Sequence, residues 1–232
     1  MKYLSFGAGV QTTTILFMYP QIKFDEVIFA DTGAESPETY EYLEKYSIPF
    51  MQENGIKFTV VKGNEKGIDN LEEYCLYYKI IPSMRVRWCN YKFKTKPIEK
   101  YILTKPKNEF PIVGILGISS DESHRIKTSK YNWLSYEYPL IKLKMTREDC
   151  KRFIEKKGYP IPPKSGCFFC PFQRKKEWEE LYLKHPDLYE RAIRLEENSQ
   201  QFENFKLLPS GISLRELRKH FGYGNHKLDE YD

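Results

Sequence analysis

The chain has 232 residues, which is enough for one α/β domain with an extension or for two small domains. Apolar residues make up 41% of it, which supports a packed core and excludes a disordered chain, and no apolar run reaches the roughly 18 residues that a membrane helix needs. The net charge of +5 suits an anionic ligand without requiring nucleic acid. Five cysteines and the lack of a signal-peptide pattern predict a cytoplasmic protein without a disulfide framework.

A glycine turn near the N-terminus organises the rest of the chain. Residues 3–6 form a short apolar run that predicts a strand, residues 13–18 predict a helix, and Gly7, Ala8 and Gly9 lie between them. The first backbone N–H groups of such a helix point at the turn, and glycine lets a phosphate approach them closely. Thr12 or Thr13 would add a hydroxyl donor or cap the helix. The pattern is compatible with a phosphate cradle or with a plain tight turn.

The next elements alternate between strand and helix. Residues 25–30 predict a buried strand, and residues 57–61 predict a third strand. Between them, Ser36 as N-cap and Pro37 at the first position open a helix that ends before Gly55. This alternation predicts a parallel sheet with right-handed crossovers, in which ligands bind at the carboxyl ends of the strands.

Two polar stretches follow a predicted helix over residues 68–81. Residues 85–98 are strongly basic, which is typical of either a solvated helix face or an anion-binding segment. Residues 111–118 predict the most hydrophobic strand, and a dense polar cluster over residues 119–125 follows it. Within that cluster, Arg125 beside Glu122 and Ser123 suits an oxyanion or a phosphate.

The last third of the chain is predicted to be mainly helical. After a short predicted strand at 138–143, Thr146 caps a helix that Gly158 stops. The proline-rich residues 159–163 predict a boundary between an α/β domain at 1–158 and a C-terminal extension at 159–232. The extension contains predicted helices from residue 175, split at 185–187, another over 214–220, and a loose tail at 225–232.

Four features stand in a fixed order along the chain: the glycine turn, Asp31-Thr32-Gly33, Arg87-Trp88-Cys89 with Lys92, and residues 117–125. Over roughly residues 1–171 this order resembles the phosphoadenosine phosphosulfate reductase family, within the adenine nucleotide alpha-hydrolase (PP-loop) superfamily. The resemblance implies an α/β fold with a Rossmann-like (HUP-type) parallel sheet flanked by helices, and a C-terminal helical extension packed on it.

The resemblance also implies a set of nucleotide-binding residues: Ser5, Phe6, Gly7, Ala8, Gly9, Gln11, Thr12, Asp31, Thr32, Gly117, Glu122 and Ser123. Lys92 and Arg125 would act as catalytic residues that neutralise the anionic end of the ligand. Relatives usually carry Ser-Gly-Gly-x-Asp-Ser in the loop, whereas this chain has Gly7 for the serine and Gln11 for the acid. Reductases of the family also use a cysteine near the C-terminus as nucleophile, and no cysteine follows Cys170.

Three cysteines are the candidate metal ligands: Cys89, Cys167 and Cys170. By resemblance to iron–sulfur relatives they would hold a [4Fe–4S] cluster with one iron lacking a cysteine ligand. Zinc with a histidine such as His124 or His185, and reduced cysteines without metal, are the alternatives. Cys75 and Cys150 have apolar helical neighbours and are predicted to be packing residues.

The function that this resemblance implies is an enzyme that binds ATP or a related adenylyl nucleotide, with Mg²⁺. It would act as a nucleotide-dependent transferase or adenylating enzyme that uses its metal centre for sulfur transfer or substrate adenylation. The partners would be an adenine nucleotide and an acceptor, either nucleic acid or a small molecule, with no membrane. Two alternatives are a binding module for nucleotides or nucleic acids without turnover, and a sulfonucleotide reductase that uses an external thiol. The oligomeric state and the acceptor stay open.

Overall fold

The computed structural model describes residues 1–201 and 205–221, and the chain divides into two compact units. The sheet unit contains residues 1–31, 35–61 and 96–165. The helical unit contains residues 32–34, 62–95 and the described residues from 166 onward. Each unit has a hydrophobic core of its own.

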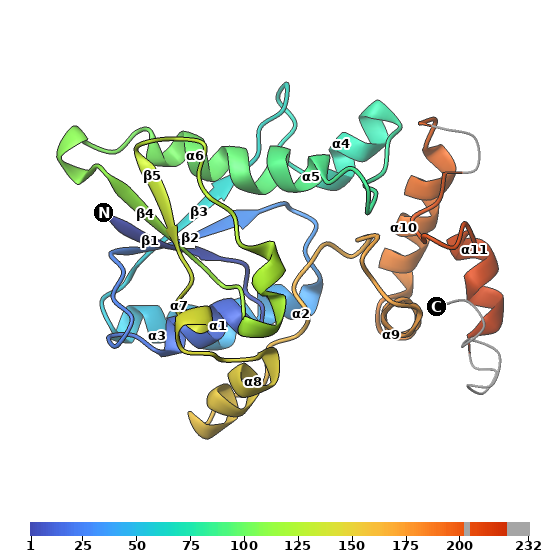
Figure 1. Ribbon diagram of the computed structural model, residues 1–232. Coiled ribbons are helices and arrows are strands. Elements are labelled where there is room, and N and C mark those ends of the chain that lie inside the picture. The colour runs from blue at the N-terminus through green and yellow to red at the C-terminus, as the bar shows by residue number, and fades with distance from the viewer. Residues whose placement is uncertain (202–204, 222–232) are drawn as a thin grey trace. The chain divides into compact units, whose positions relative to one another are not determined.

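A five-stranded parallel sheet forms the centre of the sheet unit (Figure 1). Its strands are β1 (Lys2–Phe6), β2 (Glu26–Asp31), β3 (Lys57–Lys62), β4 (Ile112–Leu116) and β5 (Leu134–Glu137), in the order β3-β2-β1-β4-β5. Leu4 is in register with Val27 of β2 on one side and with Ile115 of β4 on the other. The predicted α/β class and parallel sheet are therefore confirmed.

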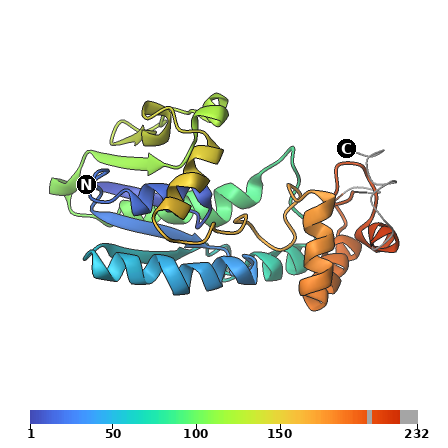
Figure 2. The same ribbon diagram turned by 90° about the horizontal axis from the view of Figure 1, so that it is seen from below.

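The helices have the following bounds. Those of the sheet unit are α1 (Val10–Phe17), α2 (Pro37–Tyr42), α3 (Ile48–Glu53), α6 (Lys96–Ile102), α7 (Pro139–Lys142) and α8 (Arg147–Lys156). Those of the helical unit are α4 (Leu71–Tyr78), α5 (Trp88–Asn90), α9 (Lys175–Lys184), α10 (Pro186–Asn198) and α11 (Leu214–Leu217). Two π-helical segments, Leu43–Ser47 and Tyr91–Thr95, join α2 to α3 and α5 to α6. Consequently α2, the π-helical segment and α3 continue one another as a long rod (Figure 2).

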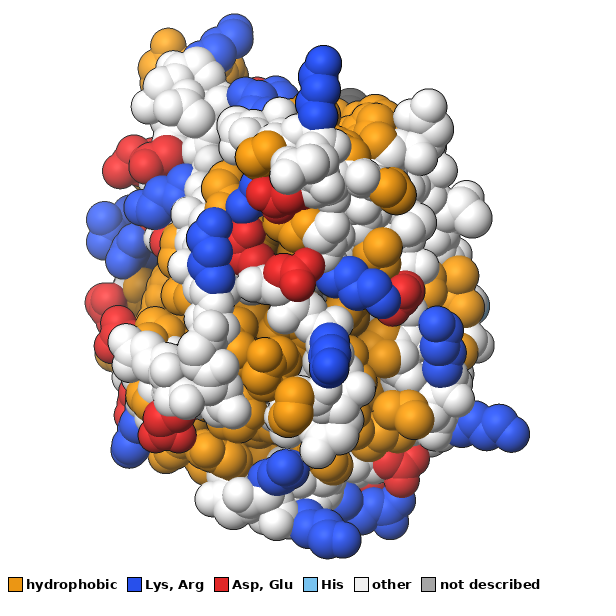
Figure 3. Space-filling view, turned by 90° about the vertical axis from the view of Figure 1, so that its left-hand side faces the viewer, with side chains coloured by type: hydrophobic (Ala, Val, Ile, Leu, Met, Phe, Trp, Pro, Cys, Tyr) orange, Lys and Arg blue, Asp and Glu red, His pale blue; other side chains and the backbone are white. Residues whose placement is uncertain are grey.

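Alternate residues of the strands supply the two cores of the sheet unit, because successive side chains point to opposite faces of a sheet. Leu4, Val27 and Phe29 pack with residues of α1, α3 and α8. Tyr3 and Ile28 face the other way and pack with residues of α6. Figure 1 shows α6 on one face and α1 and α3 on the other. On the side of the molecule where the N-terminus lies, hydrophobic side chains reach the surface between charged ones (Figure 3).

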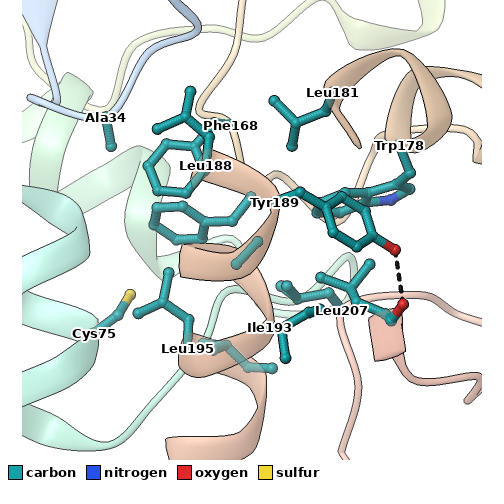
Figure 4. Packing of buried hydrophobic residues seen from close by; sticks show 14 of the residues in the cluster. Ala34, Cys75, Phe168, Trp178, Leu181, Leu188, Tyr189, Ile193, Leu195 and Leu207 are labelled. Carbon is teal, nitrogen blue, oxygen red and sulfur yellow. Dashed lines mark hydrogen bonds between the residues drawn. The ribbon is translucent and has the colours of Figure 1, made fainter. Parts of the chain in front are cut away.

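The helical unit is held together by a core that joins distant segments of the chain. Trp178 and Tyr189 are fully buried there beside Phe168 (Figure 4). The Tyr189 hydroxyl donates a hydrogen bond of 2.7 Å to the backbone oxygen of Leu214, which ties α10 to the start of α11.

Most of the predicted elements are present with shifted ends, and one is wrong. The strand expected at 138–143 lies earlier, as β5, because Tyr138 leaves the sheet and Pro139 opens the short helix α7. The helix expected at 68–81 is shorter, with Asn70 as its N-cap. The cap at Thr146 is confirmed, since Thr146 and Asp149 form a reciprocal capping box.

The contacts also group residues differently from the predicted boundary at residue 158. Residues 62–95 pack with the C-terminal helices, because Leu71, Cys75 and Phe93 belong to the same core as Trp178. The tail predicted at 225–232 lies outside the described residues. Within residues 1–201 and 205–221, none of the helices combines the length and the apolar character that crossing a bilayer requires.

Candidate functional site

The strand order creates a switch point in the sheet unit. From β1 the chain moves outward through β2 and β3, and it then returns to the other side of β1 to form β4 and β5. The carboxyl ends of β2, β1 and β4 are therefore neighbours (Figure 1). Asp31 is the last residue of β2, Gly7 directly follows β1, and Gly117 directly follows β4. In open parallel sheets, ligands bind at such a point.

The turn after β1 is built without a side-chain cap. Ala8 is buried and has φ +53°, so it takes the left-handed conformation that reverses the chain. Gly9 is the N-cap of α1, and no side chain caps this helix, so neither Thr12 nor Thr13 has that predicted role. The Thr12 hydroxyl instead accepts a 3.3 Å hydrogen bond from the Gly7 nitrogen and donates one of 3.2 Å to the Gly9 oxygen. Thr12 thus braces the turn, and the backbone N–H groups of the first turn of α1 remain oriented for an anion.

The end of β4 touches this turn. A Cβ atom placed on Gly117 would lie 2.6 Å from Thr12 Cγ2 and 3.0 Å from the Thr12 backbone nitrogen. Only glycine at residue 117 permits this approach without displacing the backbone of α1. A Cβ atom on Gly9 would meet the Ser165 hydroxyl oxygen at 2.6 Å, so this glycine also borders a neighbouring segment.

A hydrogen-bonded network lies behind the turn. The side-chain amide of Gln11 donates to Glu122 Oε2 at 3.0 Å, and its carbonyl accepts from the Arg147 guanidinium at 2.8 Å. Glu122 also pairs with Arg125 at 2.7 Å. The backbone nitrogen of Arg147 donates to the Asp121 carboxylate at 3.1 Å. Gln11 therefore connects one carboxylate with one guanidinium.

Arg147 is a residue of this site that the sequence does not indicate. It is the first residue of α8, directly after the capping residue Thr146, and it lies 136 residues from Gln11 along the chain. The capping pattern locates the start of α8, but no local pattern indicates that its first side chain reaches the turn after β1.

Four other predicted nucleotide-binding residues, Asp31, Phe6, Ser5 and Ser123, lie in different local environments. Asp31 accepts a 2.6 Å hydrogen bond from the Tyr40 hydroxyl. The side chain of Phe6 is buried in the core, so only its backbone is available to a ligand. Ser5 lies in β1 in register with Ile28, and the backbone oxygen of Ser123 accepts from Ile126 in the turn that ends the polar cluster.

Two of the predicted residues belong to the helical unit. The backbone oxygen of Thr32 accepts a 2.8 Å hydrogen bond from Leu71. Lys92 donates a short hydrogen bond to the Tyr74 hydroxyl, and its ammonium lies 4.7 Å from the centre of the Tyr74 ring and 5.9 Å from that of Trp88. Lys92 is therefore held by aromatic neighbours of its own unit.

The three candidate metal ligands, Cys89, Cys167 and Cys170, all belong to the helical unit. Cys167 and Cys170 are joined by a tight turn in which the Cys170 nitrogen donates to the Cys167 oxygen at 3.0 Å. Burial raises the pKa of the Cys89 thiol and the nearby Cys170 adds to this, whereas Lys94 and Arg87 oppose it. Among residues 1–201 and 205–221, however, no three His, Cys, Asp or Glu side chains are grouped as a ready set of metal ligands.

The other two cysteines are packing residues, as predicted. Cys75 lies in the core of the helical unit, and burial raises the pKa of its thiol. Cys150 lies in the core around α1 and α8, where burial raises its pKa to about 11. Both thiols are therefore protonated at neutral pH.

Comparisons with known proteins agree with this architecture. Residues 2–163 match the model of the phosphoadenosine phosphosulfate reductase domain. The chain is also similar to the crystal structure of phosphoadenylyl-sulfate (PAPS) reductase from Candida auris in complex with phosphate. That likeness has a TM-score of 0.51 and 17% identity, and it covers 69% of this chain and 74% of the other. At this identity it supports the fold alone.

Two uncharacterized proteins of Methanocaldococcus jannaschii are also similar. MJ0973 is 27% identical over 93% of this chain and 54% of its own length, and MJ0066 is 26% identical over 82% of this chain and 40% of its own length. The chain thus spans about half the length, or less, of the curated relatives it matches. Because the domain model covers well over half of the sequence, the chain belongs to the phosphoadenosine phosphosulfate reductase domain family, within the PP-loop superfamily.

Proposed function

We propose that the protein is an enzyme that binds ATP or a related adenylyl nucleotide at the switch point of the sheet unit. The observation that carries this proposal is the contact between Gly117 and Thr12, which brings the end of β4 against an uncapped helix start. An uncapped helix start next to a glycine-lined turn provides backbone donors for a phosphate. Family membership supports an adenine nucleotide as the source of that phosphate.

The proposed reaction is substrate adenylation. An oxygen of the acceptor attacks the α-phosphate, pyrophosphate leaves with the electrons of the broken P–O bond, and a sulfur or other nucleophile then displaces AMP. The loop amides would bind the phosphates, while Arg125 would neutralise charge that develops on them. Glu122 and Ser123 would lie beside the ligand, and Mg²⁺ would supply further charge neutralisation when bound.

Release of pyrophosphate tests the proposal. Full-length protein with ATP, Mg²⁺ and candidate acceptors should release pyrophosphate and AMP above the background rate. Arg125→Ala should weaken ATP binding in a direct titration. Unchanged ATP affinity in this variant would contradict the placement of the anionic end of the ligand. ATP binding without release of either product would favour the non-catalytic binding module.

A sulfonucleotide reductase is the second candidate, and family membership favours it. In this candidate an external thiol such as reduced thioredoxin would supply the two electrons that convert the sulfo group to sulfite. Thioredoxin-dependent sulfite release from a sulfonucleotide would support this candidate over adenylation. Pyrophosphate release from ATP without sulfite release would reject it.

A metal centre at Cys89, Cys167 and Cys170 is a separate proposal. The turn between Cys167 and Cys170 and the proximity of Cys89 to Cys170 support it. Among the described residues these three thiols are not grouped as a set of metal ligands, so no step of the proposed reaction depends on this centre. Protein purified anaerobically should be brown and absorb near 400 nm (roughly where iron–sulfur charge transfer lies). A colourless protein with stoichiometric zinc would select zinc, and a metal-free protein would reject both.

A further inference from the structure

We propose that the helical unit carries a separate surface that binds single-stranded nucleic acid, formed by residues 84–95 and 171–176 and called here the basic surface. These two segments contain seven Lys and Arg residues and no Asp or Glu, so they hold more positive charge than the net +5 of the whole chain. Arg85, Arg87, Arg174 and Lys176 among them are exposed. A dense positive charge of this kind attracts a polyanion from solution.

The two segments form one continuous surface. The guanidinium of Arg87 lies 5.0 Å from the centre of the Phe172 ring, and both side chains are exposed. The contact between Arg87 and Phe172 therefore connects segments that are more than 70 residues apart in the sequence.

The basic surface also exposes apolar and aromatic side chains, which distinguishes it from an ordinary solvated basic face. Val86 is 62% exposed, Tyr91 47%, Met84 43% and Phe172 38%. Aromatic rings and the plane of an arginine guanidinium are the surfaces on which unpaired bases stack. In a duplex the bases already stack on one another, so the combination favours a single strand over a duplex. An acidic protein would meet the charge but would not require the stacking faces.

The cations of the basic surface differ in how far they are already paired. Arg174 forms an ion pair with Glu177 at 3.1 Å, which partly neutralises it. Lys92 donates a hydrogen bond to the Tyr74 hydroxyl, which directs its ammonium toward Tyr74. Arg85 and Arg87 are the exposed cations that we assign to the phosphates. All of these residues belong to the helical unit, so this proposal does not depend on the nucleotide site of the sheet unit.

Fluorescence anisotropy with the full chain tests the proposal. The probes are labelled oligo-dT and oligo-U of about 20 nucleotides and a mixed-sequence duplex of the same length. Both single strands should bind more tightly than the duplex, and their affinity should fall steeply between about 50 and 200 mM salt. The double variant Arg85→Ser with Arg87→Ser should bind them at least about tenfold more weakly, with a salt slope reduced by about 0.7 for each lost phosphate contact.

Two further variants separate stacking from charge. Phe172→Leu keeps an apolar side chain and every charge, so it should weaken single-strand binding several-fold and leave the salt slope unchanged. Lys156→Ser with Lys157→Ser is the matched control, because it removes the same charge from the exposed end of α8 in the sheet unit. It should change the affinity less than about twofold. Thermal unfolding followed by circular dichroism should be the same for all variants.

Four outcomes would overturn the proposal. They are no binding of either single strand, equal affinity for the duplex, equal weakening by the control pair, and displacement of the oligonucleotide by polyglutamate as effectively as by unlabelled oligo-dT. The last outcome would identify the surface as one for acidic proteins. A positive result would stand even if ATP did not bind, and a negative result would leave the nucleotide proposal unaffected.

Discussion

Gly117 lies so close to Thr12 that a methyl group on Gly117 would be 3.0 Å from the Thr12 backbone nitrogen. The two residues are 105 positions apart in the chain, yet they meet at the switch point of the strand order, since Thr12 braces the turn after β1 and Gly117 directly follows β4. The contact leaves no room for a side chain at residue 117, so its effect on stability can be measured by substitution.

Gly117→Ala should lower the free energy of unfolding by about 1–3 kcal/mol, because the added methyl group overpacks against backbone atoms that cannot move independently. Urea-induced unfolding measures this effect. Gly7→Ala is the matched control in the same turn, because a Cβ atom there would meet nothing within 4 Å. Equal destabilisation by the two substitutions would contradict the close approach of Gly117 to α1.

Arg147→Gln should weaken binding of ATP or pyrophosphate about tenfold, the effect of losing one charge-assisted hydrogen bond near an anion. The physical reason is that Arg147 orients Gln11 behind the turn and adds positive charge there. Isothermal titration measures the affinity. Arg152→Gln is the control, because Arg152 pairs with Asp149 on the exposed side of α8. A loss of affinity in the control equal to that in Arg147→Gln would point to a non-specific charge effect.

Glu26 should make the protein sensitive to acid. Burial raises the pKa of its carboxyl group, but hydrogen bonds from Lys105, Thr59 and Tyr101 outweigh this and lower the pKa to about 2. Because the folded pKa lies below the ordinary value, the stabilisation is complete above pH 4.5 and is lost as the pH falls from there to about 2. The shift corresponds to about 3 kcal/mol at most.

Glu26→Gln should therefore be less stable than the wild type at pH 7, and the difference should shrink as the pH approaches 2. Chemical unfolding at a series of pH values measures it. Glu137→Gln breaks the exposed ion pair with Lys2 and serves as the control, with an expected effect below about 1 kcal/mol. A constant difference between wild type and Glu26→Gln over this pH range would show that the carboxylate does not carry the effect.

Glu196→Ala should destabilise the helical unit. The two carboxylate oxygens of Glu196 accept hydrogen bonds from the buried backbone nitrogens of Leu207 at 3.0 Å and Leu214 at 2.9 Å. Removing the acceptor leaves both N–H groups buried and unpaired, which costs about 2–4 kcal/mol. The neighbouring Glu197→Ala breaks only an exposed pair with Arg215 and should cost less than about 1 kcal/mol.

Tryptophan fluorescence during urea unfolding measures the free energy of unfolding of the Glu196 and Glu197 variants, because Trp178 is buried in the core of this unit. Similar losses of stability in the two variants would contradict the assignment of Glu196 to the buried amides.

The sequence by itself determined the features that depend on residues a few positions apart. Apolar runs ending in polar turns located four of the five strands, the Thr146–Asp149 spacing located the start of α8, and the glycine turn identified the end of β1. Each follows from backbone conformation and local hydrogen bonding, which near neighbours control. The prediction of a strand at 138–143 was wrong, because the apolar residues of this segment fit a strand pattern but Pro139 begins the helix α7.

Only the tertiary structure decided how distant side chains meet. Gln11 hydrogen-bonds to Glu122 and to Arg147. Residues 62–95 contribute to the same hydrophobic core as Trp178, and the Arg87 guanidinium lies against the Phe172 ring. These contacts depend on strand order and on how side chains fill a shared core. A local pattern in the sequence does not specify them, because each involves residues far apart in the chain that meet only when the unit containing them has folded.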